Sequence, residues 1–345
     1  MIVALIVFSV LVLWLTVPVQ AVLDGKEGLT TVDNESTGGS LLGDLSTIDL
    51  STIDLSEIGL SDIESPSIES PSIEFSSKPT GIAIALLMRK PVDLPLWLDH
   101  HRELGITKFF IRLEDTPGWK SFLDAQKDIV YETAESDREN NYETLQKRQV
   151  EFVNKSLDKC RKNYPDIGWL FHIDSDELLE GDLSIIKKLP PNIKTVKLQN
   201  AEAILDGTEK TCFDAKQFLK CGKRAPCRSY VNGKAGGRVE PDVKLSGPHD
   251  FSYKGNHQGE HLENIAFEKL NVLHFDSCSF GAWSEKFQHL SKTKSKDAIP
   301  FQYYKKSIDA TARAYDLYKQ QVMPDAKKFD DTLLYMRMNA ENRDN

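Results

Sequence analysis

The chain has 345 residues and a net charge of −9, and 40% of its residues are hydrophobic. This length suits one large domain or two small ones. Residues 24–79 hold 12 acidic and 2 basic residues, whereas residues 80–345 hold 40 and 41, so the acidity belongs to the first part of the chain. Because the sequence has no basic tract and no stripe of basic and aromatic residues, nucleic acid is not an expected partner.

The chain opens with an apolar segment. Residues 2–19 are almost wholly apolar and approach the length of a membrane span. Two interpretations are open. Segment 1–22 stays as a signal anchor, which predicts a single-pass type II protein of the Golgi membrane, or it is a signal peptide with a cleavage site at Val19-Gln20-Ala21 and the protein is secreted. Both interpretations direct the remaining chain into the secretory pathway.

Residues 23–79 are predicted to form a stalk. They contain two tandem copies of Asp-Leu-Ser-Thr-Ile and two of Glu-Ser-Pro-Ser-Ile. Prolines, serines and like charges oppose packing, so we expect a disordered spacer, with a short β-solenoid as the alternative. Asn34 in this segment, and Asn154 in a predicted helix, match the pattern of glycan acceptors.

Strands and helices alternate in the sequence after residue 80. Apolar runs and helical spacing predict strands at 81–88, 109–113, 128–131 and 169–173 and helices at 91–104 and 141–163. This alternation predicts an α/β fold, Rossmann-like, with a mostly parallel sheet flanked by helices.

We expect a single catalytic domain at 80–345. It divides into a nucleotide-binding half at 80–180, an acceptor half at 181–300 with strands at 194–198 and 270–275, and C-terminal helices at 301–345. Three cysteines, Cys212, Cys221 and Cys227, cluster in the acceptor half, while Cys160 and Cys278 lie apart. An oxidising lumen permits one or two disulfides and leaves at least one thiol.

The most informative segment follows the predicted strand at 169–173. That buried strand ends in Asp174-Ser175-Asp176. Since chemistry in α/β sheets gathers at the carboxyl ends of strands, both carboxylates should face a crevice. Two carboxylates spaced in this way can hold one hard divalent cation together with phosphate oxygens. A metal held by Asp174 and Asp176 has room for a third protein ligand, for which His274 and His249 are the candidates.

Several motifs together resemble the GT-A-fold glycosyltransferases of the family-2-like and family-92-like groups. The resemblance spans about residues 81–290 and rests on the order and spacing of six segments: 88–90, 97–105, 169–177, 232–238, 247–249 and 274–286. It implies a nucleotide-sugar donor and a divalent metal, usually Mn²⁺ (or Mg²⁺), held by Asp174 and Asp176. His274 matches the late histidine that often completes such a site.

Further residues are candidates for binding the nucleotide-sugar donor. Lys234 and Arg238 suit a diphosphate, or belong to a solvated basic turn. Arg89 and Asp115, at the ends of the first two strands, would lie near the nucleoside together with Asp174, or are ordinary loop residues. An inverting enzyme also needs a carboxylate that deprotonates the acceptor hydroxyl.

Four unranked carboxylates are candidates for that base: Glu202, Asp250, Asp276 and Glu285. Trp283 is either a platform for an acceptor sugar or a core residue. The sequence therefore predicts a metal-dependent glycosyltransferase that moves a hexose from a nucleotide sugar, a UDP-sugar, to a glycan or glycoprotein. The alternatives are a hydrolase whose metal is held by His172, Asp174 and Asp176, and a noncatalytic sugar-binding protein of the same fold.

Overall fold

A computed structural model describes residues 79–134, 144–222, 227–254, 261–292, 302–310 and 314–337. All of them belong to the second of two compact units, Ile73–Asn345. The predicted leader at 1–22, the predicted stalk at 23–79 apart from its last residue, and the acceptor pattern at Asn34 lie outside the described residues. Among the helices of the described ranges, none is long and apolar enough to cross a membrane.

The larger of the two main sheets has seven strands. In spatial order they are β12 (Leu262–Ile265), β6 (Thr195–Leu198), β9 (Lys234–Arg238), β4 (Ile167–His172), β1 (Gly81–Met88), β2 (Lys108–Glu114) and β3 (Ile129–Ala134). β4, β1, β2 and β3 pair in parallel, as do β12 and β6, while β9 is antiparallel to both of its neighbours. The predicted α/β class, a mostly parallel sheet flanked by helices, is therefore confirmed.

Strand β1 is apolar throughout because both of its faces are covered. Its larger side chains, such as Ile84 and Leu86, face the core formed with α2 (Leu94–Leu104), while Ala83 and Ala85 face α4 (Leu145–Asn163). Burying a side chain of that size stabilises the fold by roughly 1.5–3 kcal/mol. A fully buried parallel strand reads as a continuous apolar run, which is how the sequence presents it.

Helix α2 begins and ends at residues with clear physical roles. The Asp93 side chain accepts a hydrogen bond from the Leu96 backbone and caps the helix, so α2 starts three residues later than the prediction from residue 91. Gly105 ends it with a φ of 103°, a left-handed conformation that glycine adopts without strain. The last residue of the helix is the predicted one.

The glycine-rich segment forms a central strand, β9, inserted between β4 and β6. A Cβ atom at Gly236 would lie 2.6 Å from the Phe171 ring, and one at Gly237 would lie 2.4 Å from the Phe251 ring. The two glycines therefore leave room for aromatic side chains that pack against the sheet. Since a glycine-rich run has weak strand propensity, this packing stabilises the strand in place of its own side chains.

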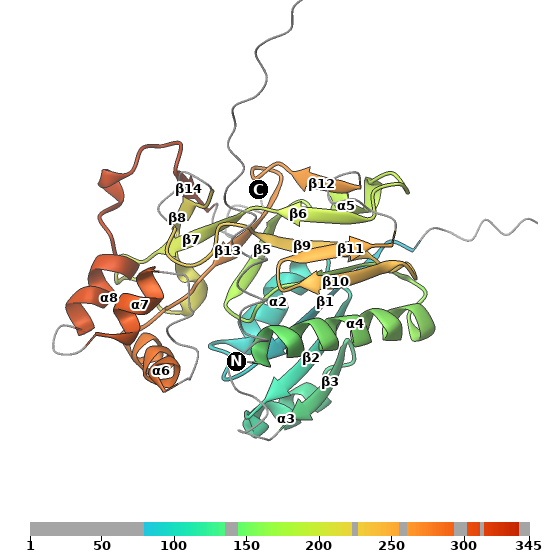
Figure 1. Cartoon of the computed structure of the whole chain (residues 1–345), viewed down its shortest axis with the longest axis horizontal. Coiled ribbons are helices and arrows are strands. Elements are labelled where there is room, and N and C mark those ends of the chain that lie inside the picture. Colours follow the sequence, from blue (N-terminus) through green and yellow to red (C-terminus); the bar gives the residue numbers. More distant parts are fainter. Residues whose placement is uncertain are drawn as a thin grey trace, which may run out of the picture. The chain divides into compact units, whose positions relative to one another are not determined.

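The second sheet combines strands from all three predicted parts of the domain, including a strand, β14 (Leu334–Met336), in the segment where only helices were expected. Its strands, in spatial order, are β14, β8 (Gln217–Lys220), β7 (Asn200–Ile204), β13 (Leu270–His274) and β5 (Glu177–Gly181). Figure 1 shows α6 (Phe280–Ser291), α7 (Gln302–Ile308) and α8 (Ala314–Val322) grouped beside it. The remaining elements are α3 (Lys120–Asp124), α5 (Ser184–Lys188), the hairpin of β10 (Val243–Gly247) and β11 (Asp250–Tyr253), and 3₁₀ turns at Pro117–Trp119, Cys212–Asp214 and Ala326–Lys328. The division at residues 180 and 300 stays a prediction.

Four of the five cysteines are paired. Cys212 pairs with Cys278 and Cys221 with Cys227, while Cys160 is a buried free thiol on α4. The first pair joins the Cys212–Asp214 turn to the loop that follows β13, and the second closes a short loop after β8.

Candidate metal and donor-binding site

The acidic triplet lies where two sheets meet. β4 ends at His172, and the chain passes through Asp174-Ser175-Asp176 directly into β5 of the second sheet. β5 pairs antiparallel with β13, so that Glu177 faces His274. This register brings the end of β13 against the acidic turn, and the Phe275 backbone donates a hydrogen bond to the Asp176 carbonyl, 2.8 Å away. Because β1 and β2 run parallel to β4, their carboxyl ends lie at the same edge.

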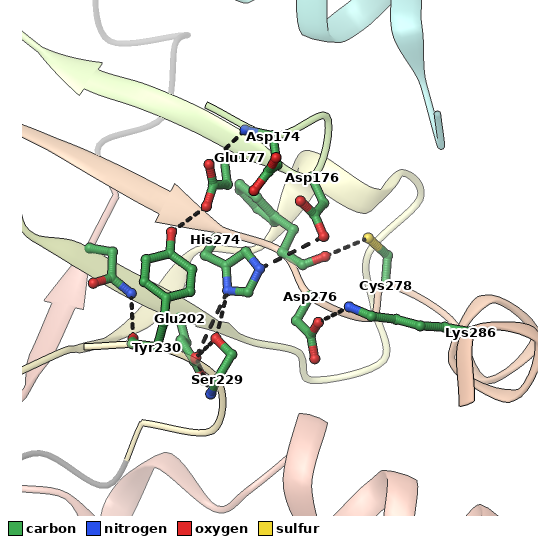
Figure 2. A network of polar contacts seen from close by, with 12 residues as sticks. Asp174, Asp176, Glu177, Glu202, Ser229, Tyr230, His274, Asp276, Cys278 and Lys286 are labelled. Carbon is green, nitrogen blue, oxygen red and sulfur yellow. Dashed lines mark hydrogen bonds and ion pairs between the residues drawn. The ribbon is translucent and has the colours of Figure 1, made fainter. Parts of the chain in front are cut away.

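Three side chains at this edge form a cluster that can hold a metal ion. One ligand atom each from Asp176, His274 and Asp276 lies within 4.8 Å of the others. His274 Nε2 is 3.7 Å from Asp176 Oδ2 (Figure 2). Asp276 Oδ2 is buried and has no hydrogen-bond partner among the described residues. A buried carboxylate oxygen without a partner is costly unless a ligand completes it, so the residues present fit a divalent cation.

The donor set also indicates which cations fit. Two carboxylate oxygens and one imidazole nitrogen suit Mn²⁺, whereas Mg²⁺ prefers oxygen ligands and water. The predicted ligands Asp176 and His274 are thus brought together, and Asp276, predicted as a candidate base, joins them. Their role as metal ligands stays a prediction.

A second layer of buried groups orients His274. The Ser229 hydroxyl lies 3.2 Å from His274 Nδ1, and Glu202 Oε1 lies 3.8 Å from the same nitrogen. Burial disfavours the imidazolium, but Asp176 and Glu202 raise the pKa of His274 to about 10. The ring is therefore protonated on both nitrogens at neutral pH. A cation that binds Nε2 must displace the proton on that nitrogen.

Glu202 has no oxygen left for a substrate. Its carboxylate is 1% exposed and accepts hydrogen bonds from the Arg228 backbone and Nε, both at 2.9 Å, and from the Ser229 backbone at 2.8 Å. Burial opposes its ionisation, yet His274 and Arg228 hold the pKa of Glu202 well below its usual range. The structure therefore places this candidate base behind the histidine, where it supports the ring.

Asp276 is held from the other side. Lys286 on α6 donates a hydrogen bond to its Oδ1, and the Tyr304 hydroxyl lies 3.2 Å from the same oxygen. Burial opposes ionisation, but Lys286 and His274 keep the pKa of Asp276 below the ordinary value. Oδ2 has no hydrogen-bond partner among the described residues.

Asp174 belongs to a neighbouring network instead of the cluster. Lys234 donates a hydrogen bond to its Oδ2, and Gln149 Nε2 donates to its Oδ1 at 3.0 Å. Lys234 also lies 3.2 Å from Glu177 Oε2, and the Tyr230 hydroxyl donates to the other oxygen of Glu177. Although burial opposes it, Lys234 holds the pKa of Asp174 well below its usual range.

Lys234 itself is completely buried, so its ammonium is occupied by these two carboxylates. The structure does not expose it to a diphosphate. Arg238 lies towards the amino end of β4: its guanidinium stacks 4.6 Å over the Trp169 ring and donates hydrogen bonds to the carbonyls of Leu189, Pro190 and Ile193. The predicted donor-binding roles of Lys234 and Arg238 therefore gain no support from their positions.

The carboxyl ends of β1 and β2 carry the other predicted donor residues. Arg89 lies 3.5 Å from Asp115, so the two form an ion pair at the predicted edge. Lys90 and Asp115 both have positive φ, 47° and 48°. Strained backbone at non-glycine residues often marks functional edges. Lys90 in turn forms an ion pair with Glu285 on α6, and both side chains are exposed.

The remaining candidates lie outside the cluster. Asp250 on β11 is exposed and pairs with Lys197. His249 bonds the Gly233 carbonyl, 2.7 Å away, and burial lowers its pKa to about 4. Trp283 is a core residue whose indole donates to the Tyr303 hydroxyl at 2.9 Å.

His172, the histidine of the hydrolase alternative, is fully buried. Its Nδ1 lies 2.9 Å from the Ala85 carbonyl, and burial lowers its pKa to about 4. It is not a member of the Asp176, His274 and Asp276 cluster found among the described residues.

Three members of this site were not predicted in these roles from the sequence. They are Asp276 as a candidate ligand, Lys286 as the neighbour of Asp276, and Ser229 as the neighbour of His274. One signal was available for Asp276. His274-Phe275-Asp276 repeats the i, i+2 spacing of Asp174-Ser175-Asp176 at the end of another strand, and in extended backbone such residues share a face. The contacts of Ser229 and Lys286 leave no comparable pattern in the sequence.

Comparisons with known proteins identify no family. No family model matches the chain, and no curated protein matches it. HddC from Yersinia pseudotuberculosis is 8% identical with a TM-score of 0.30, over 56% of this chain and 92% of that one. Rv0371C from Mycobacterium tuberculosis in complex with manganese is 13% identical with a TM-score of 0.24, over 36% and 66%. The CTP:phosphocholine cytidylyltransferase LicC from Streptococcus pneumoniae is 11% identical with a TM-score of 0.24, over 76% and 96%. Similarities of this size carry no argument about activity.

Proposed function

We propose that the chain is a metal-dependent glycosyltransferase that moves a hexose from a nucleotide sugar to a glycan or glycoprotein. The observation that carries the proposal is the cluster of Asp176, His274 and Asp276 at the carboxyl edge of the sheet. An oxygen-rich metal site at this edge suits a donor whose diphosphate must be neutralised as it departs. The resemblance to GT-A-fold glycosyltransferases points to the same chemistry.

The reaction assigns distinct tasks to the chain's own residues. Asp176, His274 and Asp276 would hold Mn²⁺, or Mg²⁺, which when bound offsets negative charge on the leaving diphosphate. Ser229 and Glu202 orient the imidazole of His274. The bond between the anomeric carbon and the phosphate oxygen breaks with its electron pair on that oxygen, while the acceptor oxygen bonds to the same carbon.

An inverting reaction also needs a carboxylate that accepts the acceptor's proton. Glu202 and Asp276 are buried and engaged by Arg228 and Lys286. Asp250 and Glu285 keep exposed carboxylates, so they remain the candidate bases. Arg89 and Asp115, which follow β1 and β2 at the same edge of the sheet as the Asp174 turn, stay proposed contacts of the nucleoside.

We further propose a UDP-sugar as donor and the secretory pathway as the compartment. The paired cysteines Cys212–Cys278 and Cys221–Cys227 support an oxidising lumen. Membrane attachment through segment 1–22, in the Golgi membrane, is a proposal from the sequence alone, as is secretion after cleavage.

A panel of nucleotide sugars, assayed for nucleotide release with Mn²⁺, tests the function. We expect UDP-sugars to give turnover that depends on an added glycan acceptor and that EDTA abolishes. Asp176→Asn and Asp276→Asn should lower turnover at least about 100-fold while each variant stays folded. Asp158→Asn, an exposed carboxylate on α4, is the matched control and should keep wild-type turnover.

The same assay distinguishes the alternatives. Nucleotide release that is independent of any acceptor would favour the hydrolase. Binding of UDP measured by calorimetry, with no release from any nucleotide sugar, would favour the noncatalytic sugar-binding protein. Turnover unchanged in both Asp176→Asn and Asp276→Asn would refute the metal site.

A further inference from the structure

Lys286 is a cation in direct contact with the candidate metal site. It projects from α6, and its Nζ donates a hydrogen bond to Asp276 Oδ1 (Figure 2). The Tyr304 ring lies 5.2 Å from the ammonium. The Asp276 side chain is 1% exposed, whereas that of Lys286 is 31% exposed. The lysine thus reaches from the solvent side of the site to a buried carboxylate.

The two oxygens of Asp276 have separate surroundings. Lys286 and Tyr304 contact Oδ1, while Oδ2 has no hydrogen-bond partner among the described residues. Binding of a metal ion through Oδ2 would therefore leave the lysine contact in place. An ammonium has three donors, of which Asp276 Oδ1 takes one and the Tyr304 side chain a second, so Lys286 keeps one donor for a second anion.

The balance of formal charge favours such an anion. In the metal-bound state, in which His274 is neutral, the group comprises three carboxylates, Asp176, Glu202 and Asp276, and two permanent cations, Arg228 and Lys286. These side chains carry a net charge of −1, and a divalent cation brings the total to +1. Arg228 is engaged by Glu202 and by the backbone carbonyls of Ala203 and Gln321. Lys286 is thus the cation of this group that remains close to a ligand of the metal.

We infer that Lys286 contacts the diphosphate of the donor, bridging a phosphate oxygen and Asp276 beside the metal site. This inference rests on the proposed function. When the bond between sugar and phosphate breaks, the electron pair stays on the phosphate oxygen, and the ammonium offsets the growing negative charge. A lysine serves phosphate as a compact point charge, which suits a position that already touches a metal ligand.

The competing interpretation is that Lys286 only positions Asp276. The two roles predict different binding data for Lys286→Met in the full chain, measured by calorimetry first with Mn²⁺ alone and then with pyrophosphate in the presence of saturating Mn²⁺. Pyrophosphate is used because its binding does not depend on which nucleoside the donor carries. A diphosphate contact predicts that Mn²⁺ binds as tightly as in the wild type or more tightly, because a competing cation has left Asp276.

Under the same role, pyrophosphate affinity should fall about 10- to 100-fold, the size of one charge-assisted hydrogen bond. Lys286→Arg should recover part of this loss, and Lys187→Met, an exposed lysine on α5, should match the wild type. With UDP in place of pyrophosphate, the variants should rank in the same order of affinity.

Two results would overturn the inference alone. Pyrophosphate affinity unchanged in Lys286→Met, or weaker Mn²⁺ binding that accounts for the whole loss, leaves the lysine a positioning role. If the wild type binds Mn²⁺ but neither pyrophosphate nor UDP, the proposed function fails together with the inference. Binding of Mn²⁺ and pyrophosphate to the wild type therefore distinguishes failure of the inference from failure of the proposed function.

Discussion

His274 Nε2 lies 3.7 Å from Asp176 Oδ2, although the two residues are far apart in the chain. The antiparallel pairing of β13 with β5 creates this contact, because it sets His274 opposite Glu177. The imidazolium and the carboxylate neutralise each other in the buried site. A divalent cation would take the place of the imidazolium proton, so metal binding and protonation compete at one nitrogen.

This competition predicts a pH dependence of Mn²⁺ binding. Since the pKa of His274 is raised to about 10, Mn²⁺ binding at pH 7 should release about one proton. Affinity should then rise about tenfold per pH unit between pH 6 and 8. Calorimetry in two buffers of different ionisation enthalpy measures the proton directly. In His274→Asn the released proton should disappear, and a wild type that releases none would contradict this protonation state.

Loss of the buried Lys234 ammonium should lower the stability of the fold strongly. Lys234→Met leaves Asp174 and Glu177 without their cation, and removing one partner of a buried ion pair costs about 3–5 kcal/mol. Urea unfolding should report that loss. Lys155→Met removes an ion pair in which the lysine is 55% exposed, and should cost less than about 1 kcal/mol. Equal losses in the two variants would refute the structural role of Lys234.

The two disulfides should differ in their contribution to stability. Cys212–Cys278 spans 66 residues and Cys221–Cys227 spans 6. Loop-closure entropy then predicts losses of about 4 and about 2 kcal/mol for the respective double serine variants. Urea unfolding tests this order. Because Cys278 is two residues from Asp276, Mn²⁺ affinity should fall in Cys212→Ser/Cys278→Ser and not in Cys221→Ser/Cys227→Ser.

The free thiol of Cys160 predicts how many cysteines react with a thiol reagent. Cys160 is buried on α4, and burial raises its pKa to about 12, so its reactive thiolate is scarce at pH 8. Titration with a thiol reagent should find no reactive group in the native protein and one after denaturation without reductant. A count of three or five in the denatured protein would show that one or both of the cysteine pairs are absent.

The helices and strands of residues 80–180, the predicted nucleotide-binding half, follow from short-range patterns. The apolar runs of β1 and β4 and the stripe of α4 predicted those elements to within a few residues, because burial on one or both faces leaves a visible period. The position of Asp174 and Asp176 directly after β4 was visible for the same reason. Strand β9 was not, since its glycines have no side chains and its stability comes from Phe171 and Phe251 on other elements.

The partners of the acidic residues, by contrast, depend on contacts between distant segments. A sequence pattern could pair Asp174 with Asp176, but the fold gives Asp174 to Lys234 and Asp176 to His274 and Asp276. Both contacts depend on which strands pair. β9 pairs with β4 and brings in Lys234, and β13 pairs with β5 and brings in His274. Periodicity records which face of an element is buried. It does not record which strand lies next to it, because that is set by long-range packing and hydrogen bonding of the whole sheet.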